Sequence, residues 1–261
     1  MKLAYHIFGA GPLSLLAFHG VGQTGYAYES WGTELGHIFT IYAFDLPFHG
    51  DNPSIHRPVL TKAEWKSFLE VFLRERAINQ FRVAGFSMGG RFALASLEAF
   101  PERILQAYLL APDGLVENRY YRFAVGSSIT RQLLKFFVKH PSLVETLANI
   151  LKKAGFIHPS TVRFVNWMLN SPEKQLQVYE SWITFRKLRF SPQKLADILN
   201  QHHIPVECLM GEFDRLMPPG QALILTSKTP HAFRTILPCG HHRLIEQAAK
   251  HKKVSNDWLE T

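Results

Sequence analysis

Three side-chain types that together can cleave an acyl bond lie far apart in this chain. Ser87 is the centre of Gly-Phe-Ser-Met-Gly, Asp214 follows Gly-Glu-Phe, and His241 directly follows a glycine near the end of the chain. A serine hydroxyl becomes a nucleophile when an imidazole takes its proton, and a carboxylate behind the imidazole orients it. The sequence therefore predicts that Ser87 is a nucleophile, with His241 as its base and Asp214 as the orienting acid.

The residues around Ser87 predict how its hydroxyl is presented. The apolar run 81–86 is typical of a strand, and 88–100, which ends before a proline, is typical of a helix. A nucleophile at such a strand-to-helix turn is held in a strained backbone conformation above the sheet edge. Gly85 and Gly89 permit the turn because they lack side chains that would collide with the neighbouring strand and helix.

Backbone amides are needed to hold the oxyanion that forms during acyl transfer. Met88 opens the predicted helix, so its amide and the positive end of the helix dipole point toward that charge. The strand at 13–18 leads into His19-Gly20, and the next amide, that of Val21, is the expected second donor. We expect His19 itself to hold the loop rather than carry a proton.

Two alternatives for the triad remain open from the pattern alone. His242 adjoins His241 and could be the base if the loop register differs by one residue. Asp113 ends the strand after that of the nucleophile, so it competes with Asp214, or caps the loop where it stands. Asp45 and His49, in a loop after another strand, are expected to hold turns.

The elements that would position these residues alternate between strands and helices. The stretch 61–78 repeats its large apolar residues at helical spacing. Strands separated by helices pair in parallel through right-handed crossovers. We therefore predict an α/β fold, a mostly parallel sheet flanked by helices, from apolar runs at 3–8, 13–18, 39–44, 81–86, 104–110, 205–210 and 232–237.

The middle of the chain has a different character. Residues 114–200 lack a convincing strand, and four Ser-Pro or His-Pro pairs within them are typical helix starts with proline in the first turn. We predict an all-helical cap at 114–200, inserted between core segments 1–113 and 201–261. The cap also carries the charge, because it holds 13 Lys and Arg against 5 Asp and Glu, whereas the remainder holds 16 of each. Such a block can attract an anionic substrate or an acidic surface, or simply form a solvated helical face.

Composition excludes several classes of protein. The 46% hydrophobic and 19% charged residues are typical of a globular protein rather than a disordered or fibrous one. No stretch is apolar enough for a membrane span, and glycines interrupt the first 30 residues where a signal peptide needs an apolar run. We expect a cytoplasmic protein with two reduced structural thiols, Cys208 and Cys239.

The motifs together resemble the α/β-hydrolase superfamily. The resemblance covers nearly the whole chain apart from the cap and implies a Ser-His-Asp triad without metal or organic cofactor. In this chain a single strand precedes 13–18, where the family usually opens with a hairpin. The residues that carry the resemblance are His19-Gly20, Asp45-Leu46-Pro47, His49-Gly50, Gly85 to Gly90, Gly211, Asp214 and Gly240-His241.

Arg91 adds a narrower likeness. It occupies the position where 2-succinyl-6-hydroxy-2,4-cyclohexadiene-1-carboxylate synthases carry an arginine that contacts a substrate carboxylate. The resemblance implies a second arginine from the cap, for which Arg119 and Arg122 are candidates, although Phe86 stands where that family often has tyrosine. Alternatively, Arg91 is a helix residue that pairs with a glutamate such as Glu98 or Glu102.

These features favour an enzyme that hydrolyses a carboxylic ester or thioester of a small molecule, with an anionic substrate as one option. The alternatives are a lyase of the synthase type named above, a carbon-carbon bond hydrolase with the same triad, and a protein that only binds its ligand. Nucleic-acid binding is not favoured, because the aromatic residues of the basic block have the helical spacing of core or pocket residues. The acyl group, the leaving group and the oligomeric state are not legible in the sequence.

Overall fold

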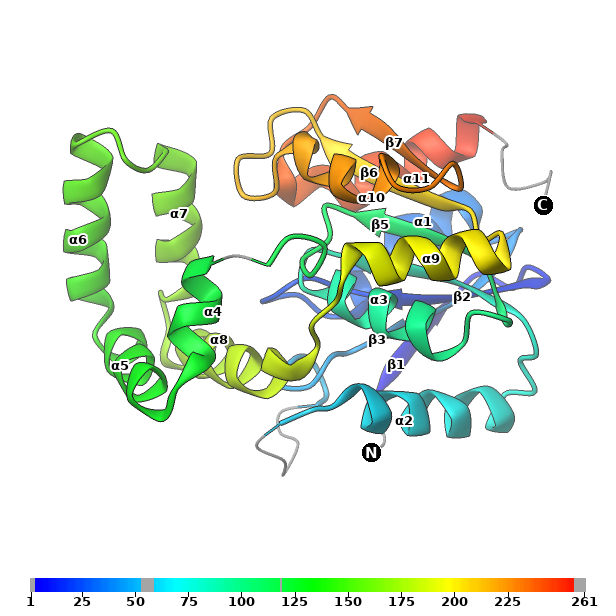
Figure 1. The fold of residues 1–261 in the computed structure, drawn as a ribbon, viewed down its shortest axis with the longest axis horizontal. Helices are drawn as coiled ribbons and strands as arrows, with labels where there is room; N and C mark the ends of the chain where they lie inside the picture. Colours follow the sequence, from blue (N-terminus) through cyan, green and yellow to red (C-terminus); the bar gives the residue numbers. More distant parts are fainter. Residues whose placement is uncertain (1–2, 53–58, 118, 256–261) are drawn as a thin grey trace. The chain divides into compact units, whose positions relative to one another are not determined.

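The computed structural model describes residues 3–52, 59–117 and 119–255, and a seven-stranded sheet forms the centre of that part of the chain (Figure 1). The strand order is β1-β3-β2-β4-β5-β6-β7; β1 runs antiparallel to β3, and all the other pairs are parallel. The predicted α/β fold with a mostly parallel sheet is confirmed. The strands are β1 (Tyr5–Phe8), β2 (Leu13–Phe18), β3 (Phe39–Phe44), β4 (Phe81–Phe86), β5 (Ile104–Leu110), β6 (Val206–Gly211) and β7 (Ala232–Leu237).

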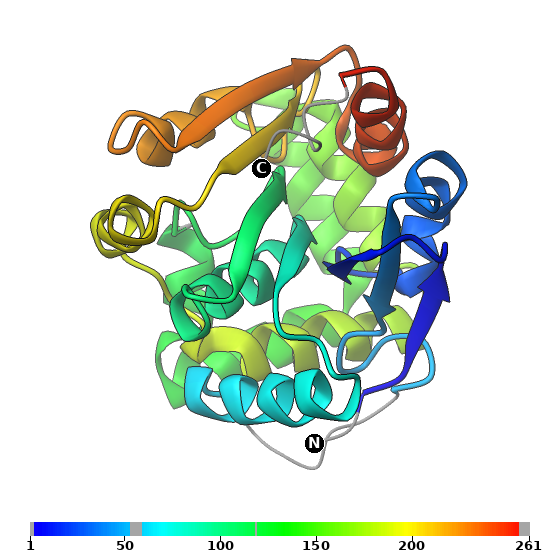
Figure 2. The same cartoon turned by 90° about the vertical axis from the view of Figure 1, so that its right-hand side faces the viewer.

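Helices cover both faces of the sheet (Figure 2). One face packs against α1 (Glu29–Leu35) and α11 (Leu244–Ser255), which also contact each other. The other face packs against α3 (Gly89–Ala99), which is flanked by α2 (Lys62–Glu75) and α9 (Pro192–His202). This layering buries the central strands on both sides, which explains why they are continuous apolar runs rather than alternating ones.

Helix α2 shows how local sequence sets an element. The Thr61 side chain accepts a hydrogen bond from the Glu64 amide, and the Glu64 side chain accepts one from the Thr61 amide. Two N–H groups at the start of the helix are therefore paired. The apolar side chains predicted to recur at helical spacing are buried on one face: Trp65, Phe68, Leu69, Phe72 and Leu73. Trp65 also donates a 3.0 Å hydrogen bond to Ser96 of α3, which fixes the two helices against each other.

Short elements complete this part of the chain. A 3-10 helix at Gly25–Tyr28 leads into α1, and another at Pro219–Ala222 leads into α10 (Leu223–Thr226). A third, His241–Arg243, opens α11. The last of these matters most, because it carries one of the predicted triad residues.

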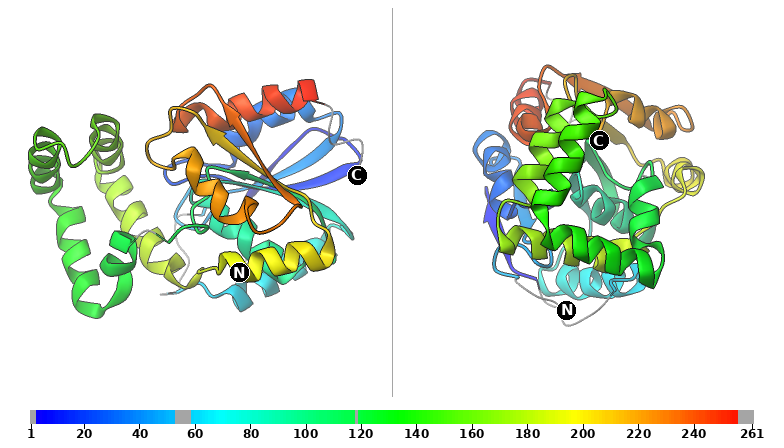
Figure 3. Two further views of the ribbon diagram at one scale, coloured as in Figure 1. Left: turned by 45° about the horizontal axis from the view of Figure 1, so that its top comes forward. Right: turned by 90° about the vertical axis from the view of Figure 1, so that its left-hand side faces the viewer.

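All the described secondary structure within Glu117–Lys187, the main segment of the second compact unit, is helical (Figure 3). Three of the predicted proline-led starts are confirmed here, in α6, α7 and α8, and the fourth is confirmed in α9. The helices are α4 (Arg119–Gly126), α5 (Ser128–Lys139), α6 (Pro141–Lys153), α7 (Pro159–Met168) and α8 (Pro172–Thr184), followed by a 3-10 turn at Phe185–Lys187.

The limits of the helical unit differ from the predicted 114–200. The first unit continues to Val116 and resumes at Leu188, so α9 belongs with the sheet. The reason is burial: Leu195, Ala196 and Leu199 of α9 are almost fully covered, and the helix contacts α3 and α10. Within the described residues, no helix is both long and apolar enough to cross a membrane.

Candidate active site

Ser87 lies at the turn between β4 and α3 in a conformation that side chains seldom adopt. Its φ is 50°, in the left-handed region. The Ser87 amide donates to the Leu110 carbonyl of the neighbouring strand at 2.9 Å, and the Ser87 carbonyl accepts from Asp113 N–H at 2.8 Å. These bonds hold the serine where β4 and β5 both end, at the carboxyl edge of the sheet.

The glycines flanking Ser87 are required by close packing. A Cβ on Gly89 would lie 2.0 Å from the Phe18 carbonyl oxygen, and one on Gly85 would lie 2.7 Å from the Cβ of Ala93. Neither neighbour can move without displacing the sheet or the helix. Close packing therefore requires glycine at positions 85 and 89 of the motif.

His241 and Asp214 meet across two loops. Nδ1 of His241 lies 2.6 Å from Oδ2 of Asp214, and both side chains are buried. The other carboxylate oxygen, Oδ1, accepts from the amides of Leu216 and Met217 at 2.8 and 2.9 Å. With both oxygens engaged, Asp214 holds the imidazole in the orientation and tautomer in which Nδ1–H donates.

The two alternatives for the triad lie elsewhere. The side chain of His242 is exposed, and its ring centroid lies 6.2 Å from that of His241. The Asp113 carboxylate pairs with Arg91. Of the two candidate acids, the structure brings Asp214 against His241.

Phe86 links the nucleophile turn to the other two loops. Phe86 directly precedes Ser87, and its ring centroid lies 4.7 Å from that of His241. A Cβ on Gly20 would come within 2.9 Å of the same ring. The loops after β2, β4 and β7 therefore converge around one phenyl ring.

The two predicted amide donors have no hydrogen-bond partner among the residues that the structure describes. Val21 lies in a tight turn in which Gly20 N–H donates to Gln23 Oε1 at 2.9 Å, and Gly22 N–H donates to His49 Nε2 at 3.0 Å. Met88 is the N-cap residue of α3. An unpaired N–H is available to a ligand oxygen.

Two buried histidines, His19 and His49, are neutral and hydrogen-bond the loops that follow β2 and β3. His19 Nδ1–H donates to the Gly20 carbonyl at 2.7 Å, and its Nε2 accepts from Leu46 N–H at 3.0 Å. Burial, and then the neighbouring His49, hold the pKa of His19 well below its usual value. Burial lowers the pKa of His49 to about 4, against the opposing effects of the Pro47 carbonyl and Asp45.

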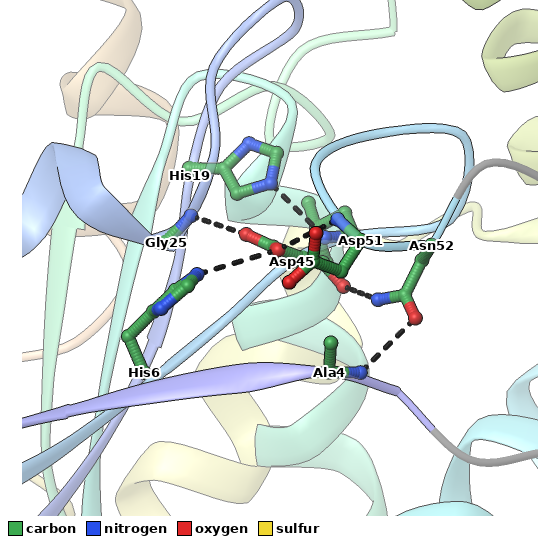
Figure 4. A network of polar contacts seen from close by, with 8 residues as sticks. Ala4, His6, His19, Gly25, Asp45, Asp51 and Asn52 are labelled. Carbon is green, nitrogen blue, oxygen red and sulfur yellow. Dashed lines mark hydrogen bonds and ion pairs between the residues drawn. The ribbon is translucent and has the colours of Figure 1, made fainter.

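Asp45 anchors the loop after β3 (Figure 4). Its carboxylate accepts from Gly25 N–H at 2.7 Å and Asp51 N–H at 3.0 Å, and lies 3.3 Å from His6 Nε2. Gly50 has a φ of 53°, and a Cβ there would meet the Asp45 carboxylate at 2.1 Å. Asp45 therefore organises turns, as its place in the sequence suggested.

Arg91 has partners that differ from both sequence-based expectations. It is 3% exposed; Nε and Nη2 donate to the two oxygens of Asp113 at 2.6 and 3.1 Å, and Nη1 donates to the Leu188 carbonyl at 2.9 Å. Glu98 pairs instead with Lys62 at 2.6 Å. All three guanidinium nitrogens of Arg91 thus have partners within the protein, which favours a positioning role.

Arg119 and Arg122 lie on α4 of the helical unit, with exposed side chains. With Tyr120 and Phe123 they line a hollow of about 490 Å³. Arg122 is 3.8 Å from Glu117, a long and exposed ion pair. Two guanidinium groups beside two aromatic rings can bind an anionic group that carries an apolar body.

Other candidate chemistry is absent from the described part of the chain. The thiols of Cys208 and Cys239 are free and buried, and burial raises the pKa of Cys208 to about 12. A thiol with a raised pKa is a poor nucleophile at neutral pH. Within the described residues, no group of three His, Cys, Asp or Glu side chains could hold a metal ion.

With this geometry established, comparison with known proteins identifies the family. A family model described as the alpha/beta hydrolase fold matches residues 14–248. The chain belongs to the α/β-hydrolase family. An α/β hydrolase of this kind has a helical cap, and the second unit of this chain is that cap.

Relatives of this α/β hydrolase include enzymes named as hydrolases. A 2-hydroxy-6-oxononadienedioate/2-hydroxy-6-oxononatrienedioate hydrolase of Paraburkholderia phymatum is 26% identical over 99% of this chain and 91% of its own. A pimeloyl-[acyl-carrier protein] methyl ester esterase of Nitrosomonas europaea is 23% identical over 89% of this chain and 90% of its own. Several longer relatives match only about half of this chain, and the matched part spans 36% of the length of those relatives.

The fold also matches solved structures. An esterase from Thermogutta terrifontis superposes with a TM-score of 0.72 and 20% identity, covering 98% of this chain and 92% of its own. At that identity the likeness shows the fold.

Sequence reasoning missed two contacts of the site. It did not find the clamp of Arg91 on Asp113 and Leu188, because those partners are 22 and 97 residues away in the chain. It also missed Gln23, whose side chain closes the turn around Val21. The polar residue three positions after Gly20 was the available signal.

Proposed function

We propose that this α/β hydrolase cleaves a carboxylic ester or thioester of a small molecule through an acyl-enzyme. The main support is the 2.6 Å contact between His241 and a fully engaged Asp214, beside the loop that carries Ser87. A carboxylate that fixes one imidazole tautomer is needed for proton transfer, whereas simple binding does not need it.

In the proposed mechanism, Ser87 Oγ attacks the carbonyl carbon while its proton passes to His241 Nε2. The tetrahedral intermediate collapses, and the leaving alcohol or thiol takes the proton from His241. Water then attacks the acyl-enzyme, gives a proton to Nε2, and Ser87 regains it as the acid departs. The amides of Val21 and Met88 stabilise the oxyanion in both steps; losing one such donor costs about 10²- to 10³-fold in kcat.

The cap supplies the proposed substrate preference. Arg119 and Arg122 line the hollow on α4, and we propose that they contact an anionic group of the substrate. Arg91 is proposed as a positioning residue, since Asp113 and Leu188 occupy its guanidinium.

Hydrolysis of short p-nitrophenyl esters tests the proposal. Ser87→Ala, His241→Ala and Asp214→Asn should each lower kcat/KM by roughly 10³-fold or more, because triad members act as a unit. His242→Ala serves as the matched control for the base and should stay within about tenfold of the parent. Equal rates for the parent and Ser87→Ala would remove Ser87 from the mechanism.

A second candidate is hydrolysis of a carbon-carbon bond in a diacid. It is favoured by the likeness of nearly the whole chain to the dienedioate hydrolase and by the two cap arginines. The lyase alternative depends on Arg91 as a substrate contact and has less support, because that side chain is committed to Asp113. A panel of esters, thioesters and vinylogous diketo acids separates the candidates by kcat/KM.

A further inference from the structure

Helices α5 and α6 of the cap expose large apolar side chains to solvent. In most proteins such residues are scattered singly, and a contiguous group marks an interaction surface. Here six lie on two consecutive helices. The exposed fractions are 77% for Ile129, 48% for Leu133, 47% for Phe136, 47% for Leu143, 50% for Leu147 and 58% for Ile150.

On each helix these residues form one stripe. Positions 129, 133 and 136 of α5, and 143, 147 and 150 of α6, repeat at the spacing of four and three that places side chains on a single helix face. We call these six residues the α5–α6 stripes.

The stripes are not the faces that hold the cap together. Val138 of α5 and Ala148 of α6 are buried, and they lie about 180° and 140° around the helix from the first residue of each stripe. The inner faces pack α5 against α4 and α8, and α6 against α7. The cap therefore has its own internal contacts, and the stripes are additional apolar surface.

Basic side chains accompany the stripes. Residues 128–153 contain five Lys and Arg and a single acidic residue, Glu145. Lys139 and Lys153 are exposed and lie about 80° around the helix from the first residue of the α5 and α6 stripes, whereas Lys135 lies about 120° away, with its ammonium 5.6 Å from the Tyr179 ring of α8. Long lysine side chains beside an apolar stripe can extend their ammonium groups to a charged surface while their stems cover apolar area.

This combination favours one kind of occupant. Interfaces with other proteins are depleted in lysine and enriched in aromatic residues, Met and Arg, whereas five of the six stripe residues are Ile or Leu and lie beside lysines. A second copy of the cap would bring like charges together. An interfacial helix pairs aliphatic and Phe residues with Lys and Arg and binds where acyl chains meet anionic head groups.

We infer that the α5–α6 stripes dock the cap on the surface of an anionic lipid bilayer. The apolar residues enter the boundary between head groups and acyl chains, and the lysines contact lipid phosphates and carboxylates. Docking of this kind is peripheral and reversible. It does not depend on the proposed function, because no residue of the triad takes part.

Co-sedimentation of the full chain with vesicles tests the inference. We expect binding to vesicles of equimolar phosphatidylcholine and phosphatidylserine, little binding to phosphatidylcholine alone, and release by high salt because screening weakens the lysine contacts. Ser87→Ala should bind like the parent, so failure here is distinct from failure of the esterase assay.

Matched variants locate the surface. The triple change Leu133→Ser, Phe136→Ser and Leu147→Ser should weaken binding by at least about tenfold, because three apolar anchors are lost. The control changes Val71→Ser and Leu223→Ser remove apolar side chains that are 41% and 50% exposed outside the cap, and they should leave binding unchanged.

Charge variants test the second half of the surface. Neutralising Lys139 and Lys153 to Gln should weaken binding on the order of 25-fold, about fivefold for each lysine. Neutralising the exposed core lysines Lys66, Lys228 and Lys250 should have little effect.

Three results would overturn the inference. The first is the absence of binding to the phosphatidylserine vesicles, and the second is equal binding by the parent and the stripe variant. The third is a stripe variant that is folded but inactive on a water-soluble ester, which would assign the stripes to the substrate site. A concentration-dependent dimer that the stripe variant abolishes, without vesicle binding, would assign them to a second copy instead.

Discussion

At the scale of single residues, the turn at Ser87 holds the hydroxyl at the sheet edge in a backbone conformation that destabilises the fold. A residue with a side chain in the left-handed region costs of order 1–3 kcal/mol, and the bonds from Ser87 to Leu110 and Asp113 hold it there. Strain of this kind is retained where the surrounding structure over-determines the backbone. The strained position coincides with the residue that we propose as the nucleophile.

Because of this strain, glycine should stabilise position 87 relative to alanine, the reverse of its usual effect within a helix. We expect Ser87→Gly to be more stable than Ser87→Ala by about 1 kcal/mol, because glycine adopts a φ of 50° without a Cβ clash. Urea unfolding of the two inactive variants measures the difference.

Ser96, in the helix α3 that follows the Ser87 turn, provides the control. It lies in the middle of α3, so Ser96→Gly should be less stable than Ser96→Ala by about 1 kcal/mol. The same rank order at both positions would contradict a strained turn.

Residue types and spacing were enough to predict much of the candidate site. Gly85, Ser87 and Gly89 form a local motif, and β4 and α3 are the neighbouring elements it requires. The choice between Asp113 and Asp214 was not local, because both follow strands that end at the same edge of the sheet. Only the partner of each carboxylate, Arg91 or His241, separates them.

At the scale of elements, Arg91 joins the first turn of α3 to both ends of the cap segment. Asp113 lies three residues before the first unit ends at Val116, and Leu188 is the residue at which it resumes. The bidentate geometry uses the fixed fork of the guanidinium. One side chain thus ties the nucleophile turn to the two stretches of the first unit that flank the cap segment.

The clamp can be tested by hydrogen exchange. Arg91→Met should accelerate exchange of the amides around Asp113 and Leu188 and destabilise the fold by about 2 kcal/mol, less than for a fully buried pair because Asp113 is 22% exposed.

A double change distinguishes the clamp from a general loss of packing. Asp113→Asn in the Arg91→Met background should restore part of the stability, because the carboxylate is no longer left unpaired. Additive effects of the two changes would show that the pair is not coupled.

The strands and most helices were predictable because their apolar runs and proline-led starts are local. The placement of α9 was not, because its sequence reads like the cap helices that precede it. What separates it is burial against α3 and α10, a tertiary contact.

At the scale of the whole molecule, buried neutral histidines make stability depend on pH. The pKa of His49 is about 4 in the folded protein, below the usual 6.5. Between these values the unfolded chain takes up a proton that the folded protein does not. The contribution of His49 to stability is therefore complete above about pH 6.5 and is lost as the pH falls toward 4.

Unfolding by urea at a series of pH values checks this. We expect the parent to lose more stability between pH 7.5 and pH 4.5 than His49→Gln does, by up to about 2 kcal/mol, because glutamine can keep both hydrogen bonds without titrating. His37→Gln is the control, since that side chain is exposed. An equal pH dependence in the parent and His49→Gln would contradict the assignment.

The central claim is that Ser87 is a nucleophile activated by His241 and Asp214. Labelling of the folded chain by a fluorophosphonate, read by intact mass and peptide mapping, tests it most directly. We predict one adduct per chain, on Ser87, in the parent and in His242→Ala, and none in Ser87→Ala or His241→Ala. A folded parent that is not labelled, or an adduct on another residue, would contradict the account.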